Sequence, residues 1–245
     1  MKFAVKSDKG LVRNINEDSY NIIAGHTGIP AAFIIADGMG GHNSGEIASR
    51  MAVDLVSNHI MQFPEKISSE ENISEAIEDM VQKANVSIHE MSREQGANFG
   101  MGTTFIVAVI CGKKLFIGHV GDSRVYLARN GGIARITTDH SFIEELIKNG
   151  SLKREEAGNH PRKNMLTRAL GCFEEILIDT YSCDVLENDT FILCTDGLTN
   201  MLGENEINDI VQKAGEPDDI CNKLVSRANE YGGEDNITVI ALKND

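Results

Sequence analysis

Positive charge is scarce in this sequence. Its 245 residues include 23 Lys and Arg against 37 Asp and Glu, which gives a formal net charge of −14. Binding to nucleic acid or to an anionic membrane surface depends on clustered cations, so this balance argues against both kinds of partner. Excess negative charge commonly serves solubility, and most of these carboxylates need no other explanation.

Long apolar runs and paired cysteines are also missing. One of the longest apolar runs, residues 105–111, is far shorter than a membrane span, and charge interrupts the N-terminus too early for a signal peptide. The five cysteines form no C-x-x-C pair. We therefore expect free thiols and a cytoplasmic protein without membrane attachment.

Boundary signals between domains are absent as well. Only four prolines occur, and no repeat or linker divides the chain, so we expect a single domain over residues 1–245. An Asn130-Gly131-Gly132 turn predicts a hairpin between 125–129 and 133–137. Other short apolar runs predict strands at 31–36, 104–111, 115–120, 191–195 and 237–242.

Helical periodicity is found in two pairs of segments. In the first pair, one helix begins near Ser44, where Ile47, Met51, Leu55 and Val56 share a face, and the other begins at residue 73. The second pair lies near residues 207–211 and after Pro217. Many neighbouring strands have no helix between them, so much of the sheet must be antiparallel. This order predicts an α+β fold in which helix pairs cover both faces of a sheet sandwich.

Four aspartates adjoin predicted strands: Asp37, Asp122, Asp196 and Asp235. Each alone is typical of a turn. Brought to one edge of a sandwich, however, they would repel each other and require counter-charge. Oxygen ligands favour Mg²⁺ or Mn²⁺. The sequence has no H-E-x-x-H zinc motif and no glycine-rich nucleotide loop.

Eight short blocks occur in a fixed order along nearly the whole chain. They are Arg13-Asn14-Ile15-Asn16-Glu17-Asp18, Asp37-Gly38-Met39-Gly40-Gly41-His42, Gly102-Thr103-Thr104, Gly118-His119-Val120-Gly121-Asp122-Ser123-Arg124, Thr138-Asp139-His140-Ser141, Thr167-Arg168-Ala169-Leu170-Gly171, Thr195-Asp196-Gly197-Leu198 and Asp235-Asn236-Ile237-Thr238. In order and spacing they resemble the bacterial form of the metal-dependent protein phosphatases, the PPM or type 2C family.

The resemblance implies a four-layer αββα sandwich of two mainly antiparallel sheets, and a binuclear centre of Mn²⁺ or Mg²⁺. Asp37 would bridge the two cations, the Gly38 carbonyl would serve one of them, and Asp196 and Asp235 the other. Asp122 would join Asp196 at a third, weaker cation. A hydroxide that bridges the cations would then attack phosphorus directly, with no phosphoenzyme.

The resemblance also assigns supporting roles. Glu17 and Asp18 would hold metal-bound waters, Asn236 would position Asp235, and Arg13 would bind the substrate phosphate with its two-pronged guanidinium. These roles, together with the ligands above, complete the predicted site.

The proton donor to the leaving group stays open. Met39 stands where eukaryotic members of the family carry a histidine. His42 is one candidate for the acid, although capping or packing at a helix start is an equally ordinary role for it. A metal-bound water near Asp122 is the other candidate. His119, inside a strand, is expected to be a hydrogen-bonded core residue.

The segment 141–165 is richer in cations than the rest of the chain. It contains Lys148, Lys153, Arg154, Arg162 and Lys163. A solvated helix and loop would explain it, and so would a flap that meets a phosphorylated substrate.

The predicted function is hydrolysis of phosphoserine and phosphothreonine in proteins by a monomer that opposes a Ser/Thr kinase. One alternative is a phosphatase dedicated to a single regulator in a partner-switching pathway. Another is an inactive module that binds phosphoproteins, although none of the expected site residues is missing.

Overall fold

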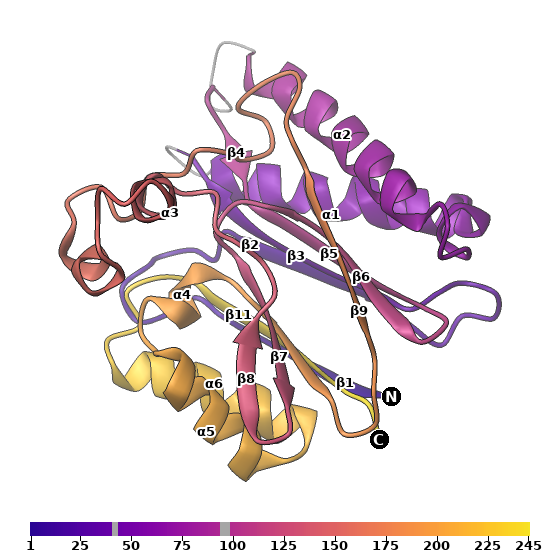
Figure 1. Ribbon diagram of the computed structural model, residues 1–245. Helices are drawn as coiled ribbons and strands as arrows, with labels where there is room; N and C mark the ends of the chain where they lie inside the picture. The colour runs from indigo at the N-terminus through magenta and orange to yellow at the C-terminus, as the bar shows by residue number, and fades with distance from the viewer. Residues whose placement is uncertain (41–43, 94–98) are drawn as a thin grey trace.

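The computed structural model describes residues 1–40, 44–93 and 99–245. In these ranges the strands form two antiparallel sheets that face each other (Figure 1). The two termini lie together at one end of the sandwich. The opposite end carries the loops that matter for function.

The first sheet has the order β1-β11-β10-β7-β8 and joins the two ends of the chain, because β1 pairs with β11 from Lys2–Lys243 to Asp8–Ile237. Its strands are β1 (Lys2–Asp8), β7 (Arg124–Arg129), β8 (Gly132–Arg135), β10 (Thr190–Cys194) and β11 (Ile237–Lys243).

The second sheet has the order β2-β3-β5-β6-β9, with the short β4 pairing the end of β3. Its strands are β2 (Asp18–Ile23), β3 (Ala32–Met39), β4 (Gly102–Thr103), β5 (Phe105–Cys111), β6 (Lys114–Val120) and β9 (Asp179–Asp184).

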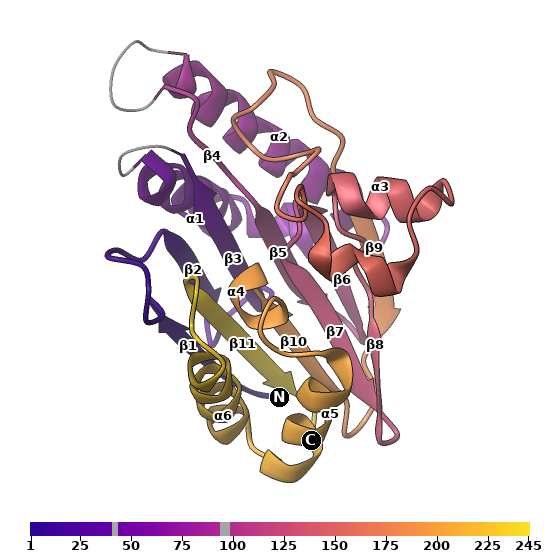
Figure 2. The same cartoon turned by 90° about the vertical axis from the view of Figure 1, so that its left-hand side faces the viewer.

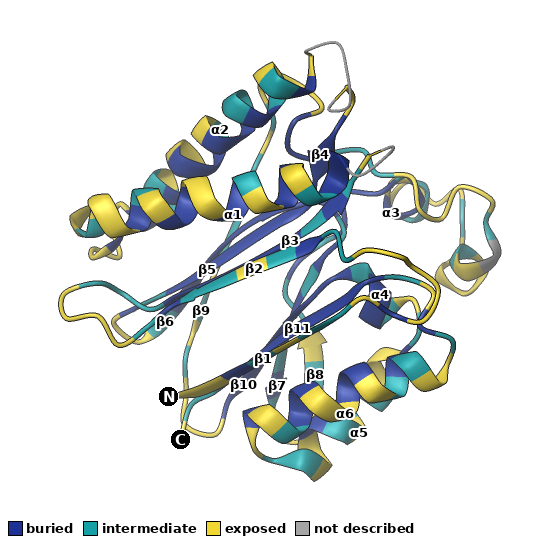
Figure 3. Cartoon of the chain, turned by 180° about the vertical axis from the view of Figure 1, so that it is seen from behind, coloured by how far each residue is buried: buried dark blue, intermediate teal, exposed yellow. Residues whose placement is uncertain are grey.

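Helices cover the outer face of each sheet, as Figure 3 shows from behind. α1 (Ser44–Gln62) and α2 (Ile73–Ser92) pack on the second sheet, and α5 (Glu204–Ala214) and α6 (Pro217–Glu230) on the first. Shorter elements complete the fold: η1 (Pro64–Ile67), α3 (Phe142–Lys148), η2 (Arg154–Asn159) and α4 (Asp196–Thr199).

Three apolar cores separate these four layers, one between the sheets and one under each helix pair. Along β3, Ile34 and Ala36 face the helices, whereas Phe33 and Ile35 face the other sheet. Because both faces of such a strand are buried, its sequence is continuously apolar. The predicted four-layer αββα sandwich is confirmed.

The turn predicted between β7 and β8 is also confirmed. Asn130 and Gly131 have φ angles of 53° and 80°, the left-handed values that a tight two-residue hairpin requires.

The strands that the sequence did not predict are β1, β2, β9 and the two-residue β4, and the first three lie at sheet edges. Their residues are largely polar or half-exposed. An edge strand is less buried and carries polar side chains that discourage further pairing, so it shows no apolar run to detect.

The predicted apolar face of α1 is partly wrong. Ile47 and Leu55 are 39% and 38% exposed, whereas Val56 is buried as predicted, together with Ala48 and Ala52. The small residues on the buried face let the helix approach β3 closely, and Ile47 and Leu55 lie on its outer side. No helix in the described part of the chain is long and apolar enough to cross a membrane.

Candidate active site

A pocket of about 530 Å³ opens at the end of the sandwich away from the termini. Figure 2 looks onto this end, where α4 lies between the two sheets and α3 projects to one side. Strands and turns of both sheets supply its floor. Asp37 lies near the end of β3, Asp122 in the turn after β6, Asp196 at the start of α4, and Asp235 just before β11.

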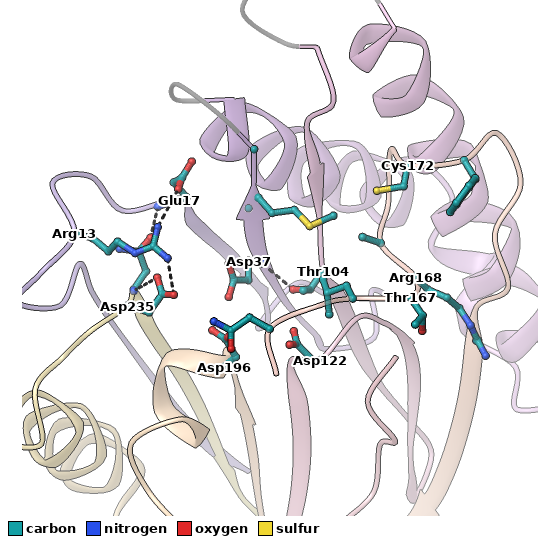
Figure 4. Close-up of a pocket in the computed structure, with 18 residues that line it drawn as sticks. Arg13, Glu17, Asp37, Thr104, Asp122, Thr167, Arg168, Cys172, Asp196 and Asp235 are labelled. Carbon is teal, nitrogen blue, oxygen red and sulfur yellow. Dashed lines mark hydrogen bonds and ion pairs between the residues drawn. The ribbon is translucent and has the colours of Figure 1, made fainter. Parts of the chain in front are cut away.

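The four aspartates therefore line one pocket, and their carboxylates are labelled in Figure 4. The pocket also contains Gly38, Glu17, Asn236 and Arg13 from the predicted site. Asp18 is not among the described residues that line it; its side chain lies behind the floor, between the two sheets.

Burial and mutual repulsion disfavour the ionised form of these carboxylates. Burial raises the pKa of Asp37 well above its usual value, and the charges of Asp18 and Asp196 raise it further. Burial, followed by the charges of Asp196 and Asp139, raises the pKa of Asp122 to about 8. Burial and then the charge of Asp235 raise the pKa of Asp196. Bound positive charge would therefore stabilise the ionised form of these carboxylates.

This donor set fits a divalent cation. Asp196 accepts a hydrogen bond from Asn200 Nδ2 at 3.0 Å through Oδ2, while its buried Oδ1 has no partner among the described residues. Ligands made only of oxygen suit Mg²⁺ or Mn²⁺. Within residues 1–40, 44–93 and 99–245, no three His, Cys, Asp or Glu side chains lie close enough together to coordinate one metal ion. The carboxylate oxygens therefore line the pocket but do not form a complete coordination shell.

Arg13 lies at the rim of the pocket and contacts the carboxylates directly (Figure 4). Its Nη2 donates to Asp235 Oδ2 at 2.7 Å, and its Nη1 lies 3.9 Å from Glu17 Oε2. The side chain is 47% exposed. This half-exposed cationic group beside the acidic floor can therefore contact either Asp235 or an incoming anion.

Asn236 ties the loop that carries Arg13 to the strand end that carries Asp235. Its Oδ1 accepts from the Glu17 backbone N–H at 2.8 Å, and its Nδ2 donates to the carbonyls of Lys9 and Ile15 at 2.9 Å each. Its own N–H donates to Asp235 Oδ1 at 2.8 Å. This buried amide fixes both sides of the pocket mouth.

Asp18 links the two sheets beneath the floor. Its Oδ2 accepts from Thr195 Oγ1 at 2.9 Å and from Thr238 Oγ1 at 2.6 Å. Burial raises its pKa to about 7, although both hydroxyl contacts favour the ionised form. Asp18 therefore holds the strands next to Asp196 and Asp235 from behind.

Asp37 is held by a residue that the sequence did not assign to the site. The Asp37 backbone N–H donates to Thr104 Oγ1 at 3.0 Å, and its carbonyl accepts from the Thr104 N–H at 2.9 Å and from Thr103 Oγ1 at 2.8 Å. Thr104 also lines the pocket. The Gly102-Thr103-Thr104 block was the signal that could have found it.

Gly38 is required by close packing. A Cβ at this position would lie 2.1 Å from the Gly45 carbonyl oxygen, so any side chain would push α1 away from β3. The Gly38 N–H donates to the Glu17 carbonyl at 3.2 Å. Glycine here lets three segments converge on the pocket.

Known proteins resemble this chain in sequence and in fold. The model of the protein phosphatase 2C family matches residues 12–235. The chain belongs to the protein phosphatase 2C family. It is 38% identical over 240 residues to the serine/threonine phosphatase Stp of Listeria monocytogenes, which covers 98% of this chain and 94% of that protein.

Two solved phosphatase structures share the fold. Stp1 from Staphylococcus aureus has a TM-score of 0.93 at 30% identity and covers 99% of this chain and 94% of its own. The catalytic domain of the phosphatase PstP, in complex with two manganese ions, has a TM-score of 0.85 at 31% identity and covers 100% and 98%. This phosphatase 2C chain is thus a metal-dependent serine/threonine phosphoprotein phosphatase, as the sequence predicted.

Of the two histidines considered for the site, His42 lies outside the described residues of the phosphatase. His119 is fully buried and its Nε2 donates to the Ser123 carbonyl at 2.9 Å. Burial and then the neighbouring His140 lower its pKa to about 3. The prediction that His119 is a core residue is confirmed.

The segment 141–165 of the phosphatase is a helix and a loop beside the pocket. Ser141 Oγ caps α3 by accepting from the Glu144 N–H at 3.2 Å. Arg154 Nη2 donates to the buried Glu144 at 3.0 Å, and Arg162 lies over the Phe142 ring. Asn164 reaches the pocket wall. Two of the cations are thus engaged within the segment itself.

Proposed function

We propose that Asp37, Asp122, Asp196 and Asp235 form the metal-binding floor at which this phosphatase hydrolyses phosphoserine and phosphothreonine. The observation that carries the proposal is the gathering of four aspartates from both sheets around one pocket, where three of them have raised pKa values. Carboxylates in such a cluster are stable as anions only with counter-charge.

Two tightly bound Mn²⁺ or Mg²⁺ ions would supply that charge. Asp37 would serve both, with the Gly38 carbonyl at one and Asp196 and Asp235 at the other. Asp122 and Asp196 would hold a third, weaker ion. When bound, such ions make a water nucleophilic near neutral pH and neutralise charge on the phosphoryl oxygens.

The chain's own residues then bind and orient the substrate. The Asp235 carboxylate cannot bind Arg13 and a metal cation equally well. Metal binding would therefore free the Arg13 guanidinium to bind the substrate phosphate. Arginine offers phosphate two parallel donors. Asn236 would hold Asp235 and the Arg13 loop in fixed positions relative to each other. Glu17 and Asp18 would orient water near the floor.

The biological partners we propose are phosphorylated proteins, among them a Ser/Thr kinase and its substrates. We further infer that residues 1–245 act as one catalytic domain, as a monomer and in the cytoplasm, in keeping with five free cysteines. Segment 141–165 would act as the flap that meets the substrate.

An assay with matched phosphopeptides tests the function. Phosphoserine and phosphothreonine peptides should release phosphate with added Mn²⁺, and a phosphotyrosine peptide of the same sequence much more slowly. Chelator should stop the reaction. Undiminished hydrolysis by metal-stripped protein would contradict the proposed floor.

A further inference from the structure

The catalytic pocket has two unlike walls. Arg13 and the carboxylates lie on one side in Figure 4, and Cys172 lies on the other. The far wall carries five apolar residues beside the polar Thr167 and Arg168, namely Met39, Leu166, Ala169, Cys172 and Phe173. Its cation, Arg168, is engaged with Asp179 Oδ1 at 2.6 Å. This wall therefore offers a phosphate little charge.

Phe173 is the largest apolar side chain on this wall, and 61% of the residue is exposed. An aromatic ring that remains exposed at the mouth of a catalytic pocket leaves apolar area available for a ligand. The ring adds nothing to the three buried cores of the fold. Core packing therefore does not determine the position of the ring, which stays available to a ligand in the pocket.

The backbone that carries Phe173 is fixed firmly. Asn85, a fully buried residue of α2, donates through Nδ2 to the carbonyls of Phe173 and Glu174 at 2.9 Å each. Its Oδ1 accepts from the Gly171 N–H, also at 2.9 Å. These three hydrogen bonds of the buried amide thus all go to one loop.

Further side chains of α2 hold the same loop. Ser92 Oγ donates to the Gly171 carbonyl at 2.9 Å, and His89 Nδ1 lies 3.0 Å from the same oxygen. Gln82 Nε2 donates to the Glu174 carbonyl at 2.9 Å. The loop is thus anchored on both sides of Phe173, so little conformational entropy is lost when a ligand contacts the ring.

We infer that Phe173 and the apolar wall beside it form a specificity site for a bulky apolar side chain close to the phosphorylated residue of the substrate. The inference rests on the proposed function, since the wall is continuous with the pocket that would hold the phosphate. An extended peptide advances about 3.3 Å per residue, so the three residues on either side of the phosphorylated one span about 10 Å, and the apolar side chain is expected within that span. The substrate class is a phosphoprotein segment with such an apolar neighbour.

A phosphothreonine peptide set tests this inference. Each peptide has serine at every position from −3 to +3 except one, which carries leucine, and an all-serine peptide serves as reference. The parent protein should hydrolyse at least one leucine peptide with kcat/KM about tenfold above the reference. Phe173→Ala should abolish this preference mainly through KM, so that the leucine peptide and the all-serine peptide are hydrolysed with similar kcat/KM.

Two matched variants sharpen the test. Phe173→Leu keeps an apolar side chain and should retain most of the preference. Leu177→Ala removes a side chain on the same connection that is 73% exposed and does not line the pocket, and it should change nothing. Circular dichroism and gel filtration of each variant exclude unfolding and self-association as causes.

The possible results distinguish failure of the specificity site from failure of the proposed phosphatase function. No leucine preference in the parent protein, or a preference that survives in Phe173→Ala, overturns the specificity site while hydrolysis of the all-serine peptide leaves the proposed function standing. A change of oligomeric state in Phe173→Ala without a change of preference would make the wall a contact between copies. Failure to hydrolyse any peptide would count against the proposed function itself.

Discussion

The two walls of the catalytic pocket are built on different kinds of structure. The acidic wall comes from the ends of strands in both sheets, where Asp37, Asp196 and Asp235 adjoin buried backbone. The apolar wall comes mainly from the long connection between β8 and β9, which packs against α2 and contains no sheet of its own. Chemistry requires ligands that are fixed to a fraction of an ångström, whereas selectivity tolerates variable loops on a rigid frame.

The electrostatics of the walls differ in the same way. Repulsion between carboxylates dominates the acidic wall and makes it dependent on a cation. On the other wall, Arg168 is matched by Asp179 at 2.6 Å. Removing a carboxylate such as Asp37 or Asp196 should therefore remove most of the turnover, and altering the apolar wall should change mainly which substrate is preferred.

The largest effect is expected on the acidic floor. Asp37→Asn and Asp196→Asn should each lower kcat for phosphopeptides by roughly 100-fold or more, because losing a shared cation ligand removes several kcal/mol of transition-state stabilisation. Steady-state kinetics with Mn²⁺ would measure this. Glu70→Gln, a surface change, should stay close to the parent protein. Equal losses in all three variants would show that the assay does not report on the floor.

Arg13 separates substrate binding from the rest of the chemistry. Arg13→Ala should raise KM for phosphopeptides about 10- to 100-fold, since a charged hydrogen bond contributes roughly 1.5–3 kcal/mol, and any fall in kcat would mark a contact that strengthens in the transition state. Arg13→Lys should restore part of the affinity, because lysine lacks the planar fork. Kinetics of Arg13→Ala that equal those of the parent would remove Arg13 from the site.

The raised pKa values of the acidic wall predict how the metal-free protein responds to pH. A carboxylic acid whose pKa is higher in the folded than in the unfolded state stabilises the fold fully below the unfolded value near 4, and this contribution is lost as pH rises through the folded value. Asp18 and Asp122 have folded values of about 7 and about 8. Without metal, Tm should therefore fall by several degrees between pH 5 and pH 8.

Added Mn²⁺ and the Asp122→Asn substitution provide the controls for this pH effect on Tm. Saturating Mn²⁺ should flatten the decline, because it stabilises the ionised carboxylates. Asp122→Asn should reduce the slope of the metal-free protein, whereas Glu70→Gln should leave it unchanged. A metal-free Tm that is constant over this range would mean that the carboxylates ionise without cost.

The two walls also differ in how well the sequence predicts them. The acidic wall was predictable because strands buried on both faces read as apolar runs, and Asp37 or Asp196 at their ends interrupts the pattern. The edge strands β1, β2 and β9 and the apolar wall were not predicted. Phe173 follows no periodic pattern, and its anchoring by Asn85 joins residues far apart in the chain. Likewise Thr104 occurs in a recognised block, but its contact with Asp37 is visible only in the fold.

The smallest effect is expected at His42, and it tests whether the proton donor belongs to the acidic floor. Serine leaves as a poor alkoxide and benefits from a donor, whereas nitrophenolate hardly needs one. If the donor acts from the neighbourhood of Asp122, His42→Ala should slow a phosphoserine peptide and nitrophenyl phosphate by similar factors below about threefold. Asp122→Ala should then slow the peptide selectively and, in a calorimetric Mn²⁺ titration, lose only the low-affinity phase. A strong loss confined to the peptide in His42→Ala would instead identify His42 as the acid.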